Sequence, residues 1–305
     1  MIDFVGRKKW FSLISAVVVI VAIISLAVFE LQPGIDFTGG TSMTLHFTPQ
    51  VKQEQLRREL TNLGHPEAIV QKSGEDFLIR LKAISPQERE NFTEGLETSL
   101  GSDITARDYN TISPSIATET ARNAGIAVMI AAVAMLLYIA WAFRRMPNPF
   151  RWGICAIIAL IHDVLIVTGI FSILGQIANV EINAMFITGL LAVVGYSVNN
   201  TVVVFDRIRE NMAKGISRDF AVVVNDSLIE TVARSLNTSL TTLCVVLALF
   251  LFGGATIHLF VSVLLIGLIA GTYSSLFVAG PLLVTWEKRE WGQLFSWLPF
   301  VKKPA

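Results

Sequence analysis

Two ionisable side chains interrupt one of the long apolar stretches of this sequence. His162 and Asp163 lie in the stretch Trp152–Leu174. With a helical rise of about 1.5 Å per residue, Asp163 lies about 16 Å from the start of that stretch, near its middle. Ionisable groups are costly inside a membrane helix and usually face a bundle interior or a pathway. Asp163 could therefore be a buried acid in a polar cavity, or His162 and Asp163 could form a packing pair that neighbouring hydroxyl groups satisfy.

A stripe of polar side chains runs along a second apolar stretch, Asn183–Phe205. Tyr196, Ser197 and Asn200 follow one another at helical spacing, and Asn199 adds a second amide beside Asn200. Amides and hydroxyls on membrane helices are usually used for hydrogen bonds between helices. This stripe is therefore expected to face another helix.

A third apolar stretch opens with a cation and continues with polar residues. Arg234 shares one helical face with Thr241 and with either Asn237 or Thr238. As a boundary residue, Arg234 could simply extend its guanidinium to the membrane surface. Composition alone favours this interpretation. The amide and hydroxyls that continue inward from Arg234 stand against it, because lipid-facing positions are not normally so polar.

The composition limits the other chemistry that this chain could perform. Of its 305 residues, 53% are hydrophobic and 16% are charged, with a formal net charge of zero; soluble domains carry about 25% charged residues. A neutral chain gives no reason to expect nucleic acid as a partner. The two cysteines, Cys155 and Cys244, are too few for a disulfide framework or a metal site. No phosphate-binding loop occurs, so we expect no enzyme, no cofactor and no metal.

Six apolar stretches are long enough to cross a hydrocarbon core of about 30 Å as helices. They are Phe11–Phe29, Ala124–Phe143, Trp152–Leu174, Asn183–Phe205, Val232–Phe252 and Ile257–Val284. Among the tails and the short connections, Lys and Arg occur in the two tails and in the second and fourth connections, whereas the connections 175–182 and 253–256 contain none. The positive-inside rule therefore predicts that both termini are cytoplasmic.

The long segment 32–123 follows the first span and so lies outside; its size exempts it from the charge rule. Its patterns predict a folded domain. Alternation predicts strands at 41–47, 68–72, 77–82 and 104–111, and helical spacing predicts helices at 51–63 and 86–100, the second capped by Ser85. The order strand–helix–strand–strand–helix–strand is that of a ferredoxin-like α+β domain. The expected division is a tail and first span at 1–31, an extracytoplasmic domain at 32–123, five further spans at 124–286 with a cytoplasmic loop at about 206–231, and a cytoplasmic tail at 287–305.

Four motifs, in order along the chain, carry a resemblance to a known family. They are GIDFTGG at 34–40, GYSVN at 195–199 leading into TVVVFDRIREN at 201–211, Arg234 with NTSLTT at 237–242, and GTYSS at 271–275. From the first span to the last, the sequence closely resembles the SecD/SecF family of bacterial protein-export accessory proteins.

The resemblance implies an all-α six-helix membrane bundle that is half of a resistance–nodulation–division (RND) unit, in the bacterial plasma membrane. It implies a pseudo-symmetric SecD-like partner, association with the SecY translocon, and use of the proton motive force to help pull unfolded preprotein to the outer side, with moving external domains. Family members place a proton-handling acid directly before Thr-Val-Val in the fourth span and an arginine at the start of the fifth. The arginine matches Arg234, but the acid position holds Asn200.

The departure at position 200 matters because a carboxamide neither binds nor releases a proton in the relevant pH range. Arg234 stays protonated and could only lower the pKa of a neighbouring carboxylate. Three accounts follow: the partner supplies the titratable acid, which we favour; Asp163 takes part; or the chain is uncoupled from protons. The candidate supporting polar residues are His162, Asp163, Ser197, Asn199, Asn237, Thr238 and Thr241.

Two other functions fit parts of the sequence. A small-molecule or lipid exporter of the same superfamily would use similar helices, but such exporters usually carry both halves of the bundle in one chain. A purely structural scaffold would explain the missing acid. Co-purification with a SecD-like chain and SecY would favour export, and loss of function in Arg234→Ala with an intact complex would exclude a scaffold.

Overall fold

The computed structural model describes residues 3–290, which fold into two compact units. Among the described residues, the helical unit contains 3–31, Ala127–Val180 and 185–290. The α/β unit contains Gln32–Ile126 together with the short segment Glu181–Ala184. A segment from the middle of the chain thus joins the domain that follows the first helix.

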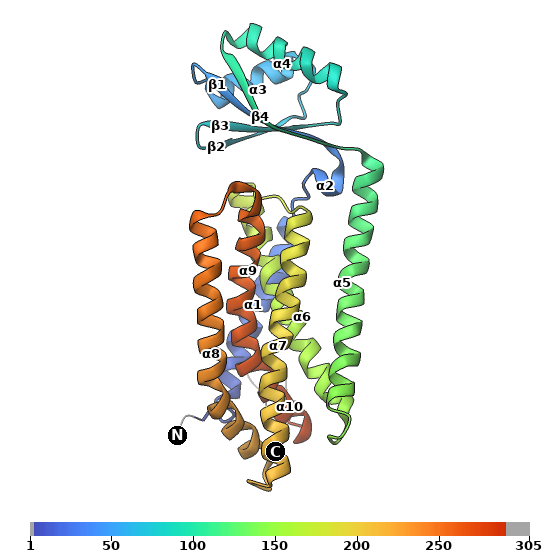
Figure 1. Ribbon diagram of the computed structural model, residues 1–305, viewed down its shortest axis with the longest axis vertical. Helices are drawn as coiled ribbons and strands as arrows, with labels where there is room; N and C mark the ends of the chain where they lie inside the picture. The colour runs from blue at the N-terminus through green and yellow to red at the C-terminus, as the bar shows by residue number, and fades with distance from the viewer. Residues whose placement is uncertain (1–2, 291–305) are drawn as a thin grey trace. The chain divides into compact units, whose positions relative to one another are not determined.

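Six helical segments are long and apolar enough to cross a membrane, which confirms the predicted number of spans. They are α1 (Lys8–Phe29), α5 (Pro114–Ala142), α6 (Pro149–Ala178), α7 (Ala184–Lys214), α8 (Phe220–Phe252) and a last segment made of α9 (Ala255–Ser274), η1 (Ser275–Ala279) and α10 (Gly280–Glu287) (Figure 1). All six are connected by short turns except α1 and α5, between which the α/β domain is inserted.

The connection between α7 and α8 differs from the expected loop at about 206–231. α7 continues to Lys214 and α8 begins at Phe220, so only a short turn separates them. Asp219 caps α8 by accepting a backbone hydrogen bond in its first turn at 3.0 Å. Glu210 and Lys214, one helical turn apart, form an ion pair of 2.6 Å that supports the end of α7. The apolar stretch shows which part of α7 can lie in the membrane. The helix continues beyond that part because polar residues such as Glu210 and Lys214 pair at helical spacing.

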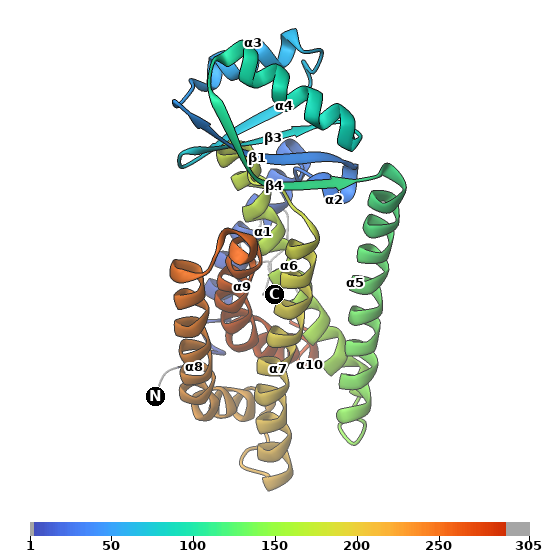
Figure 2. The same cartoon turned by 45° about the horizontal axis from the view of Figure 1, so that its top comes forward.

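The α/β unit is a four-stranded antiparallel sheet with two helices on one face (Figures 1 and 2). Its strands are β1 (Gly40–Thr48), β2 (Ile69–Ser73), β3 (Asp76–Leu81) and β4 (Asp103–Ile112), paired in the order β2-β3-β1-β4. Its helices are α3 (Gln53–Asn62) and α4 (Pro86–Leu100), preceded by the short α2 (Ile35–Thr38). The predicted strands and helices are all present within a few residues of their expected ends.

Alternation along the central strands builds the core of this domain. Every second residue of β1 and β3 is buried, and each helix adds two buried residues four apart. The core residues from these elements are Met43, Leu45, Phe47, Leu56, Leu60, Phe77, Ile79, Leu81, Phe92 and Leu96. The opposite face of the sheet does not contribute to this core.

The helix α4 begins with the predicted cap. The Ser85 hydroxyl accepts a hydrogen bond from the Glu88 backbone N–H at 3.3 Å, and the Glu88 carboxylate accepts one from the Ser85 N–H at 2.8 Å. The hydrogen bonds from the Ser85 backbone and hydroxyl favour the ionised carboxylate, so they hold the pKa of Glu88 below its usual value.

Two consecutive glycines lead the chain into β1. Gly39 and Gly40 have φ angles of +74° and +132°, which L side chains rarely adopt. A Cβ on Gly40 would also lie 2.7 Å from the carbonyl oxygen of Leu81. The backbone conformation of this turn therefore requires the two glycines of the GIDFTGG segment.

Candidate membrane-embedded polar site

Asp163 is the one acidic side chain among residues 3–290 that lies fully inside the protein, with 0% exposure. Its Oδ2 accepts hydrogen bonds from the hydroxyls of Ser197 at 2.5 Å and Ser274 at 2.7 Å. Its Oδ1 lies 3.0 Å from Nδ1 of His162. The carboxyl group of Asp163 therefore joins three helices, α6, α7 and α9.

Small residues bring α9 close enough to α7 for this contact. A Cβ on Gly267 would overlap the side chain of Val193, and a Cβ on Gly271 would lie 3.1 Å from the Cβ of Ser197. The two glycines are one turn apart, as are the two residues that they face, so this GxxxG segment packs against α7. Directly after Ser274 the helix widens into the π-helical segment η1, an irregularity frequent at functional sites.

Asn200 belongs to a second cluster, one helical turn along α7 from Ser197. Its side chain is buried, and its amide nitrogen donates a hydrogen bond to the Ser239 hydroxyl of α8 at 3.5 Å. The same hydroxyl accepts hydrogen bonds from Tyr196 at 2.9 Å and from Thr272 at 2.7 Å. The Asn200 amide thus bonds to a neutral hydroxyl.

Arg234 joins neither cluster. Its side chain is exposed and borders a cavity of about 400 Å³. The other residues that line this cavity are Val202, Val203, Asp206, Arg207, Glu210, Glu230 and Thr231. Three of these are acidic, but Glu210 and Glu230 pair with Arg207, and Asp206 pairs with Arg209. Within residues 3–290, Arg234 has no carboxylate as an ion-pair partner.

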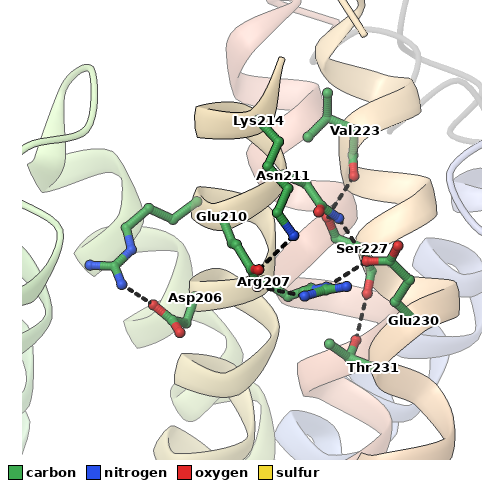
Figure 3. A network of polar contacts seen from close by, with 10 residues as sticks. Asp206, Arg207, Glu210, Asn211, Lys214, Val223, Ser227, Glu230 and Thr231 are labelled. Atoms are coloured by element: carbon green, nitrogen blue, oxygen red, sulfur yellow. Dashed lines mark hydrogen bonds and ion pairs between the residues drawn. The ribbon is translucent and has the colours of Figure 1, made fainter. Parts of the chain in front are cut away.

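The wall of this cavity is an ordered polar network that joins α7 to α8 (Figure 3). The Glu230 carboxylate accepts hydrogen bonds from the Asn211 amide at 2.8 Å and from the Arg207 guanidinium at 2.5 Å. The buried Asn211 amide also donates to the Ser227 hydroxyl at 3.0 Å. These bonds hold α7 and α8 together beside their connecting turn, so one wall of the cavity is fixed by hydrogen bonds.

The remaining predicted residues lie on faces that this chain leaves open. Asn199 on α7 and Asn237, Thr238 and Thr241 on α8 are exposed. The hydroxyls of Thr238 and Thr241 bond to carbonyls of their own helix, each at 2.9 Å. In the most apolar part of α8, 17% of the residues are buried, whereas 50% are buried in the corresponding parts of α6 and α7. A polar strip on so open a membrane helix favours a covering protein surface over lipid.

Sequence reasoning predicted His162, Asp163 and Ser197 as candidates, and the structure brings them together. The family positions of the acid and the arginine are Asn200 and Arg234; Asn200 contacts Ser239, and Arg234 borders the cavity. Sequence reasoning missed the hydroxyl partners, which are Ser239, Thr272 and Ser274. These residues lie inside the NTSLTT and GTYSS segments, so the motifs marked them without showing which residues they contact.

Six apolar helices, three of them tied by a buried carboxyl, with an α/β domain inserted after the first, define a multi-pass membrane protein. Comparison with known proteins gives the family. The family described as "Protein export membrane protein SecD/SecF, C-terminal" matches residues 93–289, and the "SecD/SecF GG Motif" matches residues 24–51. The chain belongs to the SecD/SecF family of protein-export membrane proteins.

Individual relatives confirm the resemblance that the motifs suggested. The protein translocase subunit SecF of Thermobaculum terrenum is 43% identical, over 97% of each chain. The subunit of the same name from Anaerolinea thermophila is 39% identical over 100% of this chain and 99% of its own. The crystal structure of SecDF from Thermus thermophilus, a translocon-associated membrane protein, gives a TM-score of 0.84 at 36% identity over 94% of this chain. This chain spans 39% of the length of that SecDF.

Proposed function

We propose that this protein is the SecF-type subunit of a two-chain accessory complex that assists preprotein export through the Sec translocon. Relatives named as protein translocase subunits support a role in Sec protein export. The observation that carries the finer proposal is Arg234, a cation that borders a cavity at the membrane and has no acidic partner in the described chain.

A SecD-like chain is the partner that this surface requires. SecDF of Bacillus subtilis is 35% identical over 94% of this chain, which covers 38% of the SecDF length. A region similar to this chain is therefore joined there to a larger region in one polypeptide. In the two-chain complex, the partner covers the exposed polar strip of α7 and α8 and places a carboxylate beside Arg234, with which it forms an ion pair.

The partner's carboxylate, rather than a group of this chain, carries the proton in this proposal. The Asn200 amide does not titrate in the relevant range, and it is bonded to a neutral hydroxyl. The Asp163 carboxyl accepts hydrogen bonds from Ser197 and Ser274 inside the bundle, which suits a group that holds helices together. Asp163 therefore positions α7, while the acid–arginine pair binds and releases protons from the proton motive force.

The proposed topology follows the charge distribution. Both termini are cytoplasmic, and the α/β domain lies outside the plasma membrane, where it meets the emerging unfolded preprotein. The sheet order β2-β3-β1-β4 with both helices on one face supports the ferredoxin-like assignment of that domain. The chain performs no covalent chemistry in this scheme; it couples a change among membrane helices to a domain outside.

The test compares Arg234→Ala with Asn200→Asp in membrane vesicles that contain the partner and the translocon. We expect Arg234→Ala to abolish proton uptake and late-stage translocation while the complex still co-purifies with the SecD-like chain and SecY. Asn200→Asp should change the pH dependence of proton uptake, because it adds a titratable group. Arg145→Ala, at an exposed arginine on another connection, is the matched control. If Arg234→Ala changes neither export nor proton uptake, the cavity is not the coupling site.

A further inference from the structure

A recess of about 860 Å³ opens at the end of the helical bundle where α5 turns into α6 and where α10 ends (Figure 1). Its walls are the start of α6, from Asn148 to Ile154, and the end of α10, from Trp286 to Arg289. All of these residues belong to the helical unit. No residue lines both this recess and the cavity beside Arg234, so the two are separate sites.

Two arginines give the recess a positive charge. Arg151 lies in the first turn of α6, and its guanidinium donates to the carboxylate of Glu287 on α10. The Arg151 side chain is 19% exposed, and its Nε is buried without a hydrogen-bond partner among residues 3–290. Arg289 is exposed, whereas the nearby carboxylates Glu287 and Glu290 pair with other cations. Within residues 3–290 the charge of Arg289 is therefore not balanced by an ion pair.

The start of α6 adds to the positive potential of the recess. The first N–H groups of a helix lack acceptors within the helix, and the helix dipole is positive at that end. Asn148 precedes α6 in a left-handed conformation, and its side chain caps none of these N–H groups. An anion in the recess therefore meets an uncapped helix start in addition to the two guanidinium groups.

An apolar stripe leads from the recess along α6. Its residues are Phe150, Ile154, Ile158 and Ile161, which are all exposed and follow one another at helical spacing, so they share one face. From Phe150 to Ile161 the stripe rises about 16 Å, which is about half of a hydrocarbon core of about 30 Å. Phe150 and Ile154 also line the recess. The stripe therefore begins at the charged groups and has the length that an acyl chain occupies in one leaflet.

We propose that the recess binds the phosphate group of an anionic phospholipid whose acyl chain lies along this stripe of α6. Guanidinium groups match phosphate oxygens in charge and geometry, and Trp286 supplies the kind of aromatic side chain that is enriched at the membrane boundary. A free phosphate ion would use the charges but not the stripe, so the stripe favours a lipid. A lipid of zero net charge would leave the charge of Arg289 unbalanced. The site goes beyond the proposed export function and does not depend on it.

Lipid retention by the full-length chain tests this site. The purified protein in a neutral detergent is titrated with phosphatidylglycerol or with phosphatidylcholine of the same chain length, and bound lipid is measured by native mass spectrometry. We expect stronger retention of phosphatidylglycerol, because only this lipid carries a net negative charge. An equal concentration of inorganic phosphate should not displace it, since phosphate cannot occupy the stripe. Equal retention of the two lipids, or displacement by inorganic phosphate, would overturn the proposal.

Substitutions at two charges of opposite sign should change retention in opposite directions. Arg289→Ala should weaken the retention of phosphatidylglycerol about 10-fold, the factor that corresponds to one hydrogen bond to a charged group. Glu287→Gln should strengthen retention about 5-fold, because a like charge at contact distance from the phosphate is removed. A variant that merely misfolds would lose lipid and could not gain it.

Arg145→Ala is the matched control, because Arg145 is an exposed arginine of the same connection that does not line the recess. This variant should retain phosphatidylglycerol as the unaltered chain does. Circular dichroism should show the same helix content in Arg145→Ala, Arg289→Ala and Glu287→Gln. Wild-type retention in Arg289→Ala, or an equal loss in Arg145→Ala, would refute the site and leave the export function untouched.

Discussion

Replacing Asp163 by leucine offers a quantitative test of how the helical unit is held together. The substitution removes the acceptor for the hydroxyls of Ser197 and Ser274 and the partner of the His162 ring. A buried donor left without an acceptor costs about 1–3 kcal/mol. Ser274 retains an alternative bond to the Gly271 carbonyl at 3.3 Å, so it loses least. We therefore expect Asp163→Leu to lower the free energy of unfolding by about 3 kcal/mol.

Asp163→Asn separates hydrogen bonding from charge. Its amide oxygen can accept the bonds from Ser197 and Ser274, and its amide N–H can donate to His162 in the tautomer with an unprotonated Nδ1. Because the network survives, we expect this variant to lose less than about 1 kcal/mol. Proton uptake by the complex should also survive, since the partner's acid is the titrating group in the proposed mechanism.

Thermal unfolding with a thiol-reactive dye measures the difference. Cys155 is buried on α6, about two turns before Asp163, so it reacts only when the bundle opens. The exposed Cys244 is replaced by serine so that it does not react beforehand. A loss of about 3 kcal/mol corresponds to a midpoint lowered by about 6–12 °C. Equal midpoints for Asp163→Leu and Asp163→Asn would refute the argument that hydrogen bonds to this carboxyl hold α6, α7 and α9 together.

Two further predictions concern packing and pH. Gly169→Ala should destabilise the bundle by about 1–3 kcal/mol, because a Cβ there would lie 2.6 Å from the Cα of Ala22 on α1. The control in the same dye assay is Gly125→Ala, where a Cβ would meet nothing within 4 Å. This variant should be neutral or slightly stabilising. The folded-state pKa of Glu88 lies below its unfolded value near 4.5, so its stabilising effect is present above that pH and is lost as the pH falls through the folded pKa. Glu88→Gln should therefore flatten the decline in stability at acidic pH, measured by circular dichroism, and an unchanged slope would count against the role of the Ser85 cap.

Local patterns were sufficient to predict much of this protein. The six spans follow from the length of predominantly apolar sequence, since a helix must satisfy its own backbone in lipid. The strands of the α/β domain follow from alternation, and the start of α4 follows from Ser85 and Glu88, which lie within one turn of each other. The motifs identified the family because they occur in order along a single chain. Each of these inferences needed only residues that are close in sequence.

Contacts between distant segments were decided by the tertiary structure alone. Asp163 was predicted as an intramembrane acid, but its bonds to Ser197 and Ser274 depend on how α6, α7 and α9 rotate and approach one another. Arg234 was singled out as a family position, but which cavity it borders depends on how α7 and α8 pack. Asp36 reaches Ala184 across 148 residues. Helical periodicity shows which residues share a face; which neighbour that face meets is set by packing, because close approach depends on the shape of both helices.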